Sequence, residues 1–230
     1  MKKKLNILSF AFAALLSIFL IVSCDLNDNY SRDPMFFTAL VTYEDSESGV
    51  RLQLDDSTSL VTSNLKPGLY DNKTVRALIQ YYMENSSTAV KEENTITVVA
   101  VDTIRTKPAS QDMGELNDSY YGTDKLEIIR DWVTIGEDGY LTLIVRTHRG
   151  SQSAVHSVYL VNKGEENGKY NFELRHDADG DIYGMETDGL ISFNLNELAP
   201  EDRSPVTLHL TWEGFYETKS ADFKLTFRKE

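Results

Sequence analysis

Strict alternation of apolar and polar side chains along short segments is the feature that most constrains the fold of this chain. Residues 205–212 read PVTLHLTW and residues 220–229 read SADFKLTFRK, with an apolar side chain at every second position. Successive side chains of a strand point to opposite faces, so this period predicts strands with one buried face. The predicted buried faces consist of Val206, Leu208, Leu210 and Trp212, and of Ala221, Phe223, Leu225 and Phe227.

The same pattern fills the second half of the chain. Short runs with one apolar face recur there at roughly ten-residue spacing, separated by turn residues such as Asp138-Gly139. Many short strands joined by turns are typical of an antiparallel β-sandwich, which we predict for residues 116–230. One helical turn is expected at residues 194–202. The predicted strands are residues 125–135, 140–148, 153–163, 169–176, 188–195, 205–212 and 220–229.

The first half predicts a second, smaller all-β unit. A strand at 35–45, a hairpin at 49–62, and strands at 74–85 and 94–106 would fit a small closed barrel over residues 35–115. In the segment 74–85, a period of two places Val75, Ala77 and Ile79 on one face, with Arg76 on the other. The polar stretch between about 106 and 124, with one proline and two glycines, is the predicted boundary.

The N-terminus has the parts of a secretory leader. Three lysines at positions 2–4 precede an apolar run over about 10–22, which is shorter than the roughly 20 residues of a bilayer span. Ser23 precedes Cys24, the only cysteine of the chain. The alternative to a lipoprotein signal is an ordinary signal peptide, or an uncleaved anchor, with an incidental cysteine.

Cys24 is predicted to be a lipid attachment point. No second cysteine is available for a disulfide, and a thiol is the side chain nucleophilic enough to accept a lipid at neutral pH. We therefore expect residues 1–23 to be removed and residues 24–34 to form a polar tether.

Charge excludes one class of partner. Without the leader the chain has 20 basic and 36 acidic residues, a net charge of −16. Nucleic acid binding depends on lysine and arginine contacts to phosphates, so this composition argues against it. An acidic body would instead attract cationic partners.

Several ordered segments together resemble the NigD-like lipoproteins of Bacteroidetes. They are IVSC at 21–24, RLQLDDSTSL at 51–60, VRALIQYYM at 75–83, the long run DKLEIIRDWVTIGEDGYLTLIVRTHRG at 124–150, FELRHDADGDIYG at 172–184, GLISFNL and VTLHLTW. The resemblance spans nearly the whole mature chain. It implies an N-terminal OB-type barrel, a C-terminal β-sandwich and a role in bacteriocin immunity. It carries over no catalytic residue, and only Cys24 matches a position with a known role.

Asp177, Asp179 and Asp181, in the stretch DADGD, are the most tempting metal motif. Alternating carboxylates on a tight loop can bind calcium, but the later loop positions of an EF-hand hold Ile182 and Asp188. A hairpin tip is the favoured interpretation, because Asp and Gly are ordinary turn residues.

No other group of residues predicts a site. The four histidines, His148, His156, His176 and His209, are interpreted as exposed strand residues, with His148 and His156 not facing each other. The carboxylate pairs Asp55-Asp56 and Glu92-Glu93 fall in turns, and Phe36, Phe37, Tyr81 and Tyr82 are interpreted as packing residues rather than the lining of a groove. No nucleophile elbow, phosphate loop or zinc-protease motif occurs, so we expect neither enzyme activity nor a cofactor.

These observations favour a lipid-anchored, non-enzymatic protein of the cell envelope, held at the outer membrane and facing either the periplasm or the surface. Its partner would be a cationic peptide, a protein or a glycan. Bacteriocin immunity is the most concrete form of this hypothesis, and an accessory glycan- or protein-binding lipoprotein is the alternative.

Overall fold

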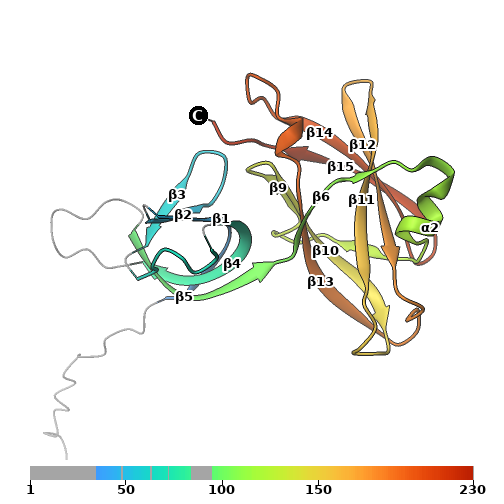
Figure 1. Ribbon diagram of the computed structural model, residues 1–230, viewed down its shortest axis with the longest axis horizontal. Coiled ribbons are helices and arrows are strands. Elements are labelled where there is room, and N and C mark those ends of the chain that lie inside the picture. The colour runs from blue at the N-terminus through green and yellow to red at the C-terminus, as the bar shows by residue number, and fades with distance from the viewer. Residues whose placement is uncertain (1–34, 48, 63, 72, 84–94, 230) are drawn as a thin grey trace, which may run out of the picture. The chain divides into compact units, whose positions relative to one another are not determined.

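The computed structural model describes residues 35–229 except 48, 63, 72 and 84–94 (Figure 1). The predicted leader and tether, Cys24 and Glu92-Glu93 lie outside the described residues. Within the described part of the chain, no helix is long and apolar enough to cross a membrane.

The first sheet is a closed five-stranded barrel, as expected for an OB-type unit. Its strands follow the order β1-β2-β3-β5-β4, in which only the β3–β5 pair is parallel. Turn chemistry sets the β2–β3 hairpin, where the Asp55 carboxylate accepts hydrogen bonds from the backbone N–H groups of Ser57 and Thr58. The strands are β1 (Phe37–Ser46), β2 (Gly49–Gln53), β3 (Ser59–Thr62), β4 (Thr74–Met83) and β5 (Thr95–Ile104).

The barrel interior contains the face predicted for β4, with Ala77 and Ile79 fully buried. Alternation implies that the opposite face of β4 is exposed to solvent. Arg76 on that face is nevertheless 0% exposed. Its guanidinium donates to the Thr42 hydroxyl at 3.0 Å and to a Glu137 carboxylate oxygen at 3.0 Å. A residue of the second sheet therefore covers this side of β4.

The second sheet contains ten strands, nine of them on one path in the order β6-β13-β10-β9-β15-β14-β12-β11-β7, with β8 pairing β10 off the path. Five of its strand pairs are antiparallel. The four parallel pairs are β6–β13, β9–β15, β12–β14 and β7–β11. The strands are β6 (Thr106–Pro108), β7 (Ser110–Gln111), β8 (Glu127–Ile129), β9 (Ile135–Glu137), β10 (Tyr140–Arg149), β11 (Ser157–Glu166), β12 (Lys169–Asp177), β13 (Met185–Asn194), β14 (Val206–Glu213) and β15 (Thr218–Leu225).

One apolar core holds the two halves of this sheet together as a sandwich. Leu143 and Phe193 come from the β13–β10 half, and Leu160, Phe172 and Leu210 from the half that runs from β15 to β11. All five are at most 1% exposed. The all-β class, the barrel and the sandwich predicted from the alternating pattern are thus confirmed.

Residues 125–135 differ from the single predicted strand. They form β8, a loop and β9, so that Val133 is buried while Trp132 is 57% exposed. The polar stretch expected as a boundary contains a 3₁₀ turn, η1 (Gly114–Leu116), and a short helix, α2 (Asn117–Tyr121). The helical turn expected at 194–202 is the 3₁₀ turn η2 (Asn196–Leu198).

Residues 106–111 form a strap across the sandwich. β6 pairs with β13 at one end of the sheet path and β7 pairs with β11 at the other, with only Ala109 between them. The sequence placed this segment with the N-terminal unit, whereas its strand partners all belong to the second sheet. The strap therefore brings β13 and β11 close together along one side of the sandwich (Figure 1).

Candidate functional site

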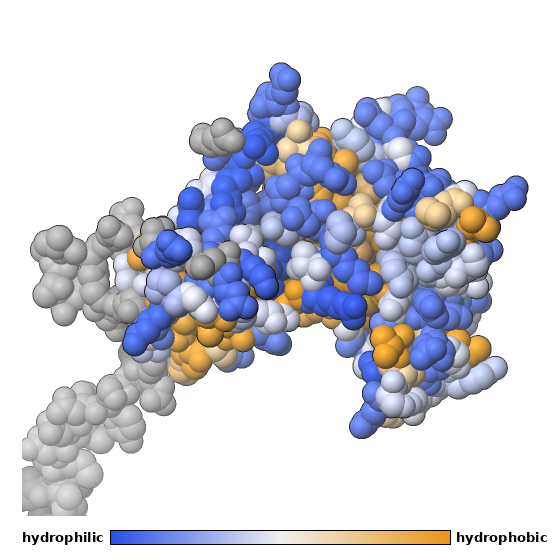
Figure 2. Space-filling view, in the orientation of Figure 1, coloured by the Kyte–Doolittle hydropathy of each residue, from blue (hydrophilic) through white to orange (hydrophobic). Residues whose placement is uncertain are grey.

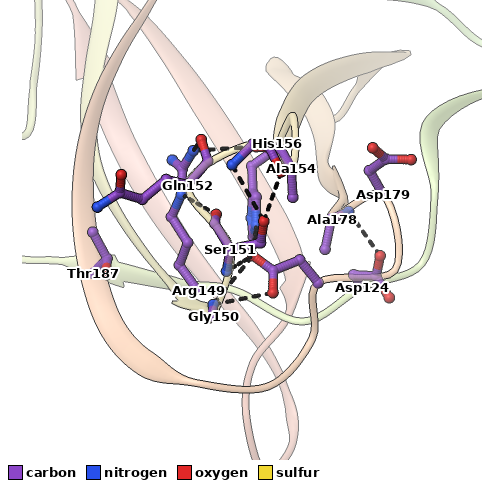
Figure 3. A network of polar contacts seen from close by, with 12 residues as sticks. Asp124, Arg149, Gly150, Ser151, Gln152, Ala154, His156, Ala178, Asp179 and Thr187 are labelled. Carbon is purple, nitrogen blue, oxygen red and sulfur yellow. Dashed lines mark hydrogen bonds and ion pairs between the residues drawn. The ribbon is translucent and has the colours of Figure 1, made fainter.

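Three loops meet at the end of the sandwich where β10 and β12 finish. Residues 150–156 join β10 to β11, residues 178–184 join β12 to β13, and residues 214–217 join β14 to β15. The Asp181 carboxylate joins the first two loops, because it accepts the backbone N–H of Gly150 at 3.0 Å and that of Ser151 at 3.0 Å. Figure 3 shows Gly150 and Ser151 in this network of polar contacts, with Ala178 next to Asp124. The hydrogen bond from the Ser151 N–H is the largest cause that holds the pKa of Asp181 below its usual range, and the hydrogen bond from Gly150 adds to it.

Two histidines, His156 from the loop before β11 and His176 from β12, are in direct contact beside Asp181. His156 Nδ1 lies 3.0 Å from His176 Nε2, and His156 Nε2 lies 3.2 Å from an Asp181 oxygen. His176 is 2% exposed, and its Nδ1 lies 3.2 Å from the Lys125 carbonyl oxygen. The two rings stack with centroids 5.1 Å apart and planes at 30°.

Donor and acceptor roles assign the protons in this chain of contacts. The Lys125 carbonyl can only accept, so His176 Nδ1 carries a hydrogen. Burial lowers the pKa of His176, which keeps the ring neutral and leaves Nε2 as an acceptor for His156 Nδ1–H. Ionised Asp181 can only accept as well, so its contact with His156 Nε2 is a hydrogen bond when that nitrogen carries the hydrogen.

A cavity of about 360 Å³, here named the histidine cavity, opens beside this pair. His176 and Asp181 form part of its wall, and His148 contacts Phe215 at its edge with ring centroids 4.5 Å apart. Asp124 lies on the wall with one oxygen accepting the Ala178 N–H at 2.8 Å, and no lysine or arginine of the described chain forms an ion pair with it. The lining comprises Thr123, Asp124, Lys125, His148, His176, Ala178, Asp181, Ile182 and Phe215.

The loops around the histidine cavity carry exposed apolar side chains. Tyr216 is 93% exposed, Tyr183 and Met185 are each 79% exposed, and Val155 is 61% exposed. Much of the surface visible in Figure 2 is hydrophilic, and apolar residues gather in separate patches. Exposed large apolar side chains beside a cavity that contains polar groups are typical of a binding site.

The three predicted calcium ligands do not converge. Asp177 accepts the Asp179 N–H at 2.9 Å, which makes a tight turn, while the Asp181 carboxylate is directed at residues 150–151 and His156. Among the residues described, no three or more Asp, Glu, His or Cys side chains are arranged to hold a metal ion. The DADGD stretch begins the connection from β12 to β13, two strands that do not pair with each other, so it forms a turn but not the tip of a hairpin.

The interpretation of the histidines as exposed strand residues is wrong for His176, which is buried. His148 and His156 each contact a different partner, Phe215 and His176. His209 lies on the outer face of β14, with Nδ1 2.6 Å from Asp222. The turn that precedes β11 relates His156 only to β10, whereas His176 lies on β12. The hairpin β11–β12, in which Val158 pairs with His176, is the signal that could have found the contact.

The aromatic residues near the start of the barrel pack in pairs, as interpreted from the sequence. Phe36 meets Tyr82 edge-on at 6.0 Å, and Phe37 meets Tyr81 at 5.7 Å. No cavity described in the structure includes them.

Comparison with known proteins agrees with the architecture. Residues 38–104 match the family model of the NigD-like N-terminal OB domain, and residues 108–225 match that of the NigD-like C-terminal β-sandwich domain. Among curated proteins, no sequence matches the chain.

Solved structures from related bacteria share the fold. A protein described as toxin-related, from Parabacteroides distasonis, is 25% identical with a TM-score of 0.65, over 84% of this chain and 94% of that one. A NigD-like immunity protein from Bacteroides caccae is 18% identical with a TM-score of 0.62, over 83% and 97%. A protein described as a lipoprotein, from Bacteroides fragilis, is 13% identical with a TM-score of 0.58, over 85% and 99%.

The two family models lie in order along the chain and together match most of it, on a barrel and a sandwich of the kinds that they describe. This protein belongs to the NigD-like family.

Proposed function

We propose that this protein is a lipid-anchored binding protein of the cell envelope that has no catalytic activity of its own. The leader and Cys24 supply the anchor, and a family relative of the same fold is described as a lipoprotein. Several acyl chains on one cysteine would hold the protein firmly, because a single chain gives only marginal membrane binding. The family models name no enzyme class.

The histidine cavity is the proposed binding site, and a cationic peptide with an apolar side chain is the proposed ligand. The carrying observation is that Asp124, an unpaired carboxylate, lies on the same wall as Ile182 and Phe215. A lysine or arginine of the peptide would form an ion pair with Asp124, while a neighbouring apolar side chain of the peptide would be buried against Ile182 and Phe215. The net charge of −16 on the mature chain would steer such peptides towards the protein.

Immunity by capture follows from this binding. Membrane-active peptides combine positive charge with apolar side chains, and a protein anchored at the membrane would bind them close to their target. One relative of the same fold is described as an immunity protein.

A titration with a cationic amphipathic peptide tests the binding step. We expect saturable binding that weakens as salt is raised, because exposed charges are screened. Asp124→Asn should weaken it several-fold, whereas Asp71→Asn, which removes an acidic charge outside the cavity, should leave it unchanged. Binding that ignores salt, or equal effects of the two variants, would contradict the proposal.

Fractionation of cells that express the chain tests the anchor. The wild-type protein should be found in the membrane fraction with a fatty-acylated N-terminal cysteine detected by mass spectrometry. Cys24→Ser should shift the protein to the soluble envelope fraction. An intact leader on the wild-type protein would overturn the anchoring proposal.

A glycan is the second candidate ligand, because a groove of about 850 Å³ runs over β15. Arg130, Asp131 and Asp222 supply planar polar groups to this groove, and Trp132 is exposed in the same loop as the first two. Polar side chains beside an aromatic ring can bind a sugar face and its hydroxyls. Saturable hits on a glycan array that Trp132→Ala removes would favour this function over peptide capture.

A further inference from the structure

A second, smaller cavity lies on the other side of the histidine pair. It has a volume of about 170 Å³ and is here named the seam cavity, because it lies where β13 and β11 approach each other beside the strap 106–111. His156 lines the seam cavity, whereas its partner His176 lines the histidine cavity. Each of the two cavities is thus lined by one histidine of the contacting pair.

The seam cavity gathers cationic side chains in a strongly acidic protein. Lys107 comes from the strap and Arg105 immediately precedes it, whereas Arg149 and His156 come from the end of β10 and the loop that follows it. Asp188 is the one carboxylate of the lining, and Arg146 already binds it at 2.6 and 2.9 Å. The positive charge is therefore not balanced from within the lining.

Three of these cations have no carboxylate partner anywhere in the described part of the chain. The Lys107 amine donates to the Val158 carbonyl at 2.9 Å and lies 4.2 Å from the Tyr159 ring centroid. The Arg149 guanidinium donates to the carbonyl groups of the loop that follows it. Among the residues that the structure describes, none forms a hydrogen bond or ion pair with the Arg105 side chain. Burial, with Arg105 nearby, lowers the pKa of Lys107, as expected where positive charge is poorly compensated.

Gly189 creates the space. It lies on the row of β13 that also contains buried Ile191, and it pairs with Val145 of β10. Gly189 is itself exposed, and a Cβ atom built on it would meet nothing within 4 Å, so the missing side chain leaves a hollow that is open to solvent. Thr147, 8% exposed on the neighbouring strand, adds a hydroxyl to the lining.

We propose that the seam cavity binds a small oxyanion, a carboxylate or phosphate group, between Arg105, Lys107 and Arg149. An oxyanion would balance the cations and accept hydrogen bonds from guanidinium and ammonium donors, which are stronger than neutral ones. The site is distinct from the peptide site proposed above, and it stands whether or not a cationic peptide binds the histidine cavity.

Calorimetric titration of the purified full-length chain in detergent tests this site. Sodium acetate, phosphate and sulfate are added separately at constant ionic strength set with chloride. We expect saturable heat from at least one of them, and the tightest binder identifies the group as carboxylate or phosphate-like. The absence of saturable heat from all three would overturn the proposal.

Two variants act on the site by different physical means. Arg105→Gln removes a cation without breaking a side-chain hydrogen bond, and it should weaken binding about tenfold, the loss expected for one charge-assisted contact. Gly189→Leu keeps every charge but fills the hollow, and it should abolish binding.

Arg51→Gln is the matched control, because Arg51 is an exposed arginine of β2 outside the cavity. It should leave the anion affinity unchanged. An equal loss in Arg51→Gln and Arg105→Gln would mean that only general charge attracts the anion, and this would overturn the site. Thermal melts of each variant confirm that it is folded.

Discussion

At the scale of single residues, the contact between His156 and His176 is the most informative feature. The ring of His176 is buried and neutral, while the ring of His156 contacts both His176 and the Asp181 carboxylate. The same polar chain fixes two loops, so a change in protonation would be felt by both. The charged groups that act on His176 are His156, Asp124 and Asp177.

Acidification should destabilise the protein through His176. Because burial lowers the pKa of His176 in the folded state, the unfolded state takes up the proton first as pH falls below about 6.5. The free energy of unfolding should therefore be lower at pH 5.5 than at pH 7.5, by at most about 1.4 kcal/mol from this residue.

Urea unfolding at the two pH values measures the effect. His176→Gln cannot take up the proton, so its stability should change less between pH 7.5 and 5.5 than that of the wild type. Thr207→Ala, on the outer face of β14, changes no titratable group and is the control. Identical pH dependence in the wild type and His176→Gln would contradict the assignment.

At the scale of strands and loops, period-two alternation predicted most of the fold. It identified the buried face of β14, where Leu208 and Leu210 are 0% exposed. It could not identify β8 and β9 as separate strands, because the break at 130–134 is a tertiary adjustment that buries Val133. Burial of Arg76 was equally invisible, since alternation describes one sheet and not what covers its other side.

The candidate site was mostly hidden from the sequence for the same reason. A histidine contact between strands depends on register, and register depends on the exact turn that joins the strands. The DADGD stretch was noticed, but its role is to shape a turn and to place Asp181 next to the β10–β11 loop.

Leu210→Ala should lower the free energy of unfolding by about 2–5 kcal/mol, the usual range for removing a fully buried leucine side chain. Leu210→Asp should unfold the sandwich altogether, because a charge would enter an apolar core. Thermal denaturation followed by circular dichroism measures both. The control is Thr207→Ala on the other face of β14, and an unchanged melt for Leu210→Asp would show that the face is assigned wrongly.

Gly184 belongs to the loop that precedes β13. Its φ is +127°, and a Cβ atom there would lie 2.3 Å from the Arg149 carbonyl oxygen. Gly184→Ala should therefore destabilise the protein by about 1–3 kcal/mol or more through backbone strain and displacement of Arg149. Chemical denaturation measures this, with Gly189→Ala as control because a Cβ there meets open space.

At the scale of the whole molecule, buried charges join the barrel to the sandwich. Arg76 on β4 binds Glu137 on β9, and Arg228 binds both Glu44 on β1 and Asp138. Burial raises the pKa of Glu137, although Arg76 opposes the shift. Such a buried ion pair gives little net stability, but loss of one partner leaves the other charge buried without compensation, which is strongly destabilising.

Arg76→Met should therefore destabilise the protein by about 3–5 kcal/mol at neutral pH. The loss should be smaller at pH 5, where an unpaired and buried Glu137 can take up a proton. Adding Glu137→Gln should recover most of the stability at neutral pH. Urea unfolding of the single and double variants measures the coupling, and a double variant less stable than Arg76→Met alone would contradict this account.

The strap 106–111 also has a consequence for the order in which the chain folds. Thr106 pairs with Ser192, and Ser110 pairs with Val161, so neither strand partner exists until long stretches of later sequence have been synthesised. Contacts between distant parts of a chain form slowly because the loop between them must first close. Docking of these six residues should be a late step of folding, and the cations of the seam cavity would come together only then.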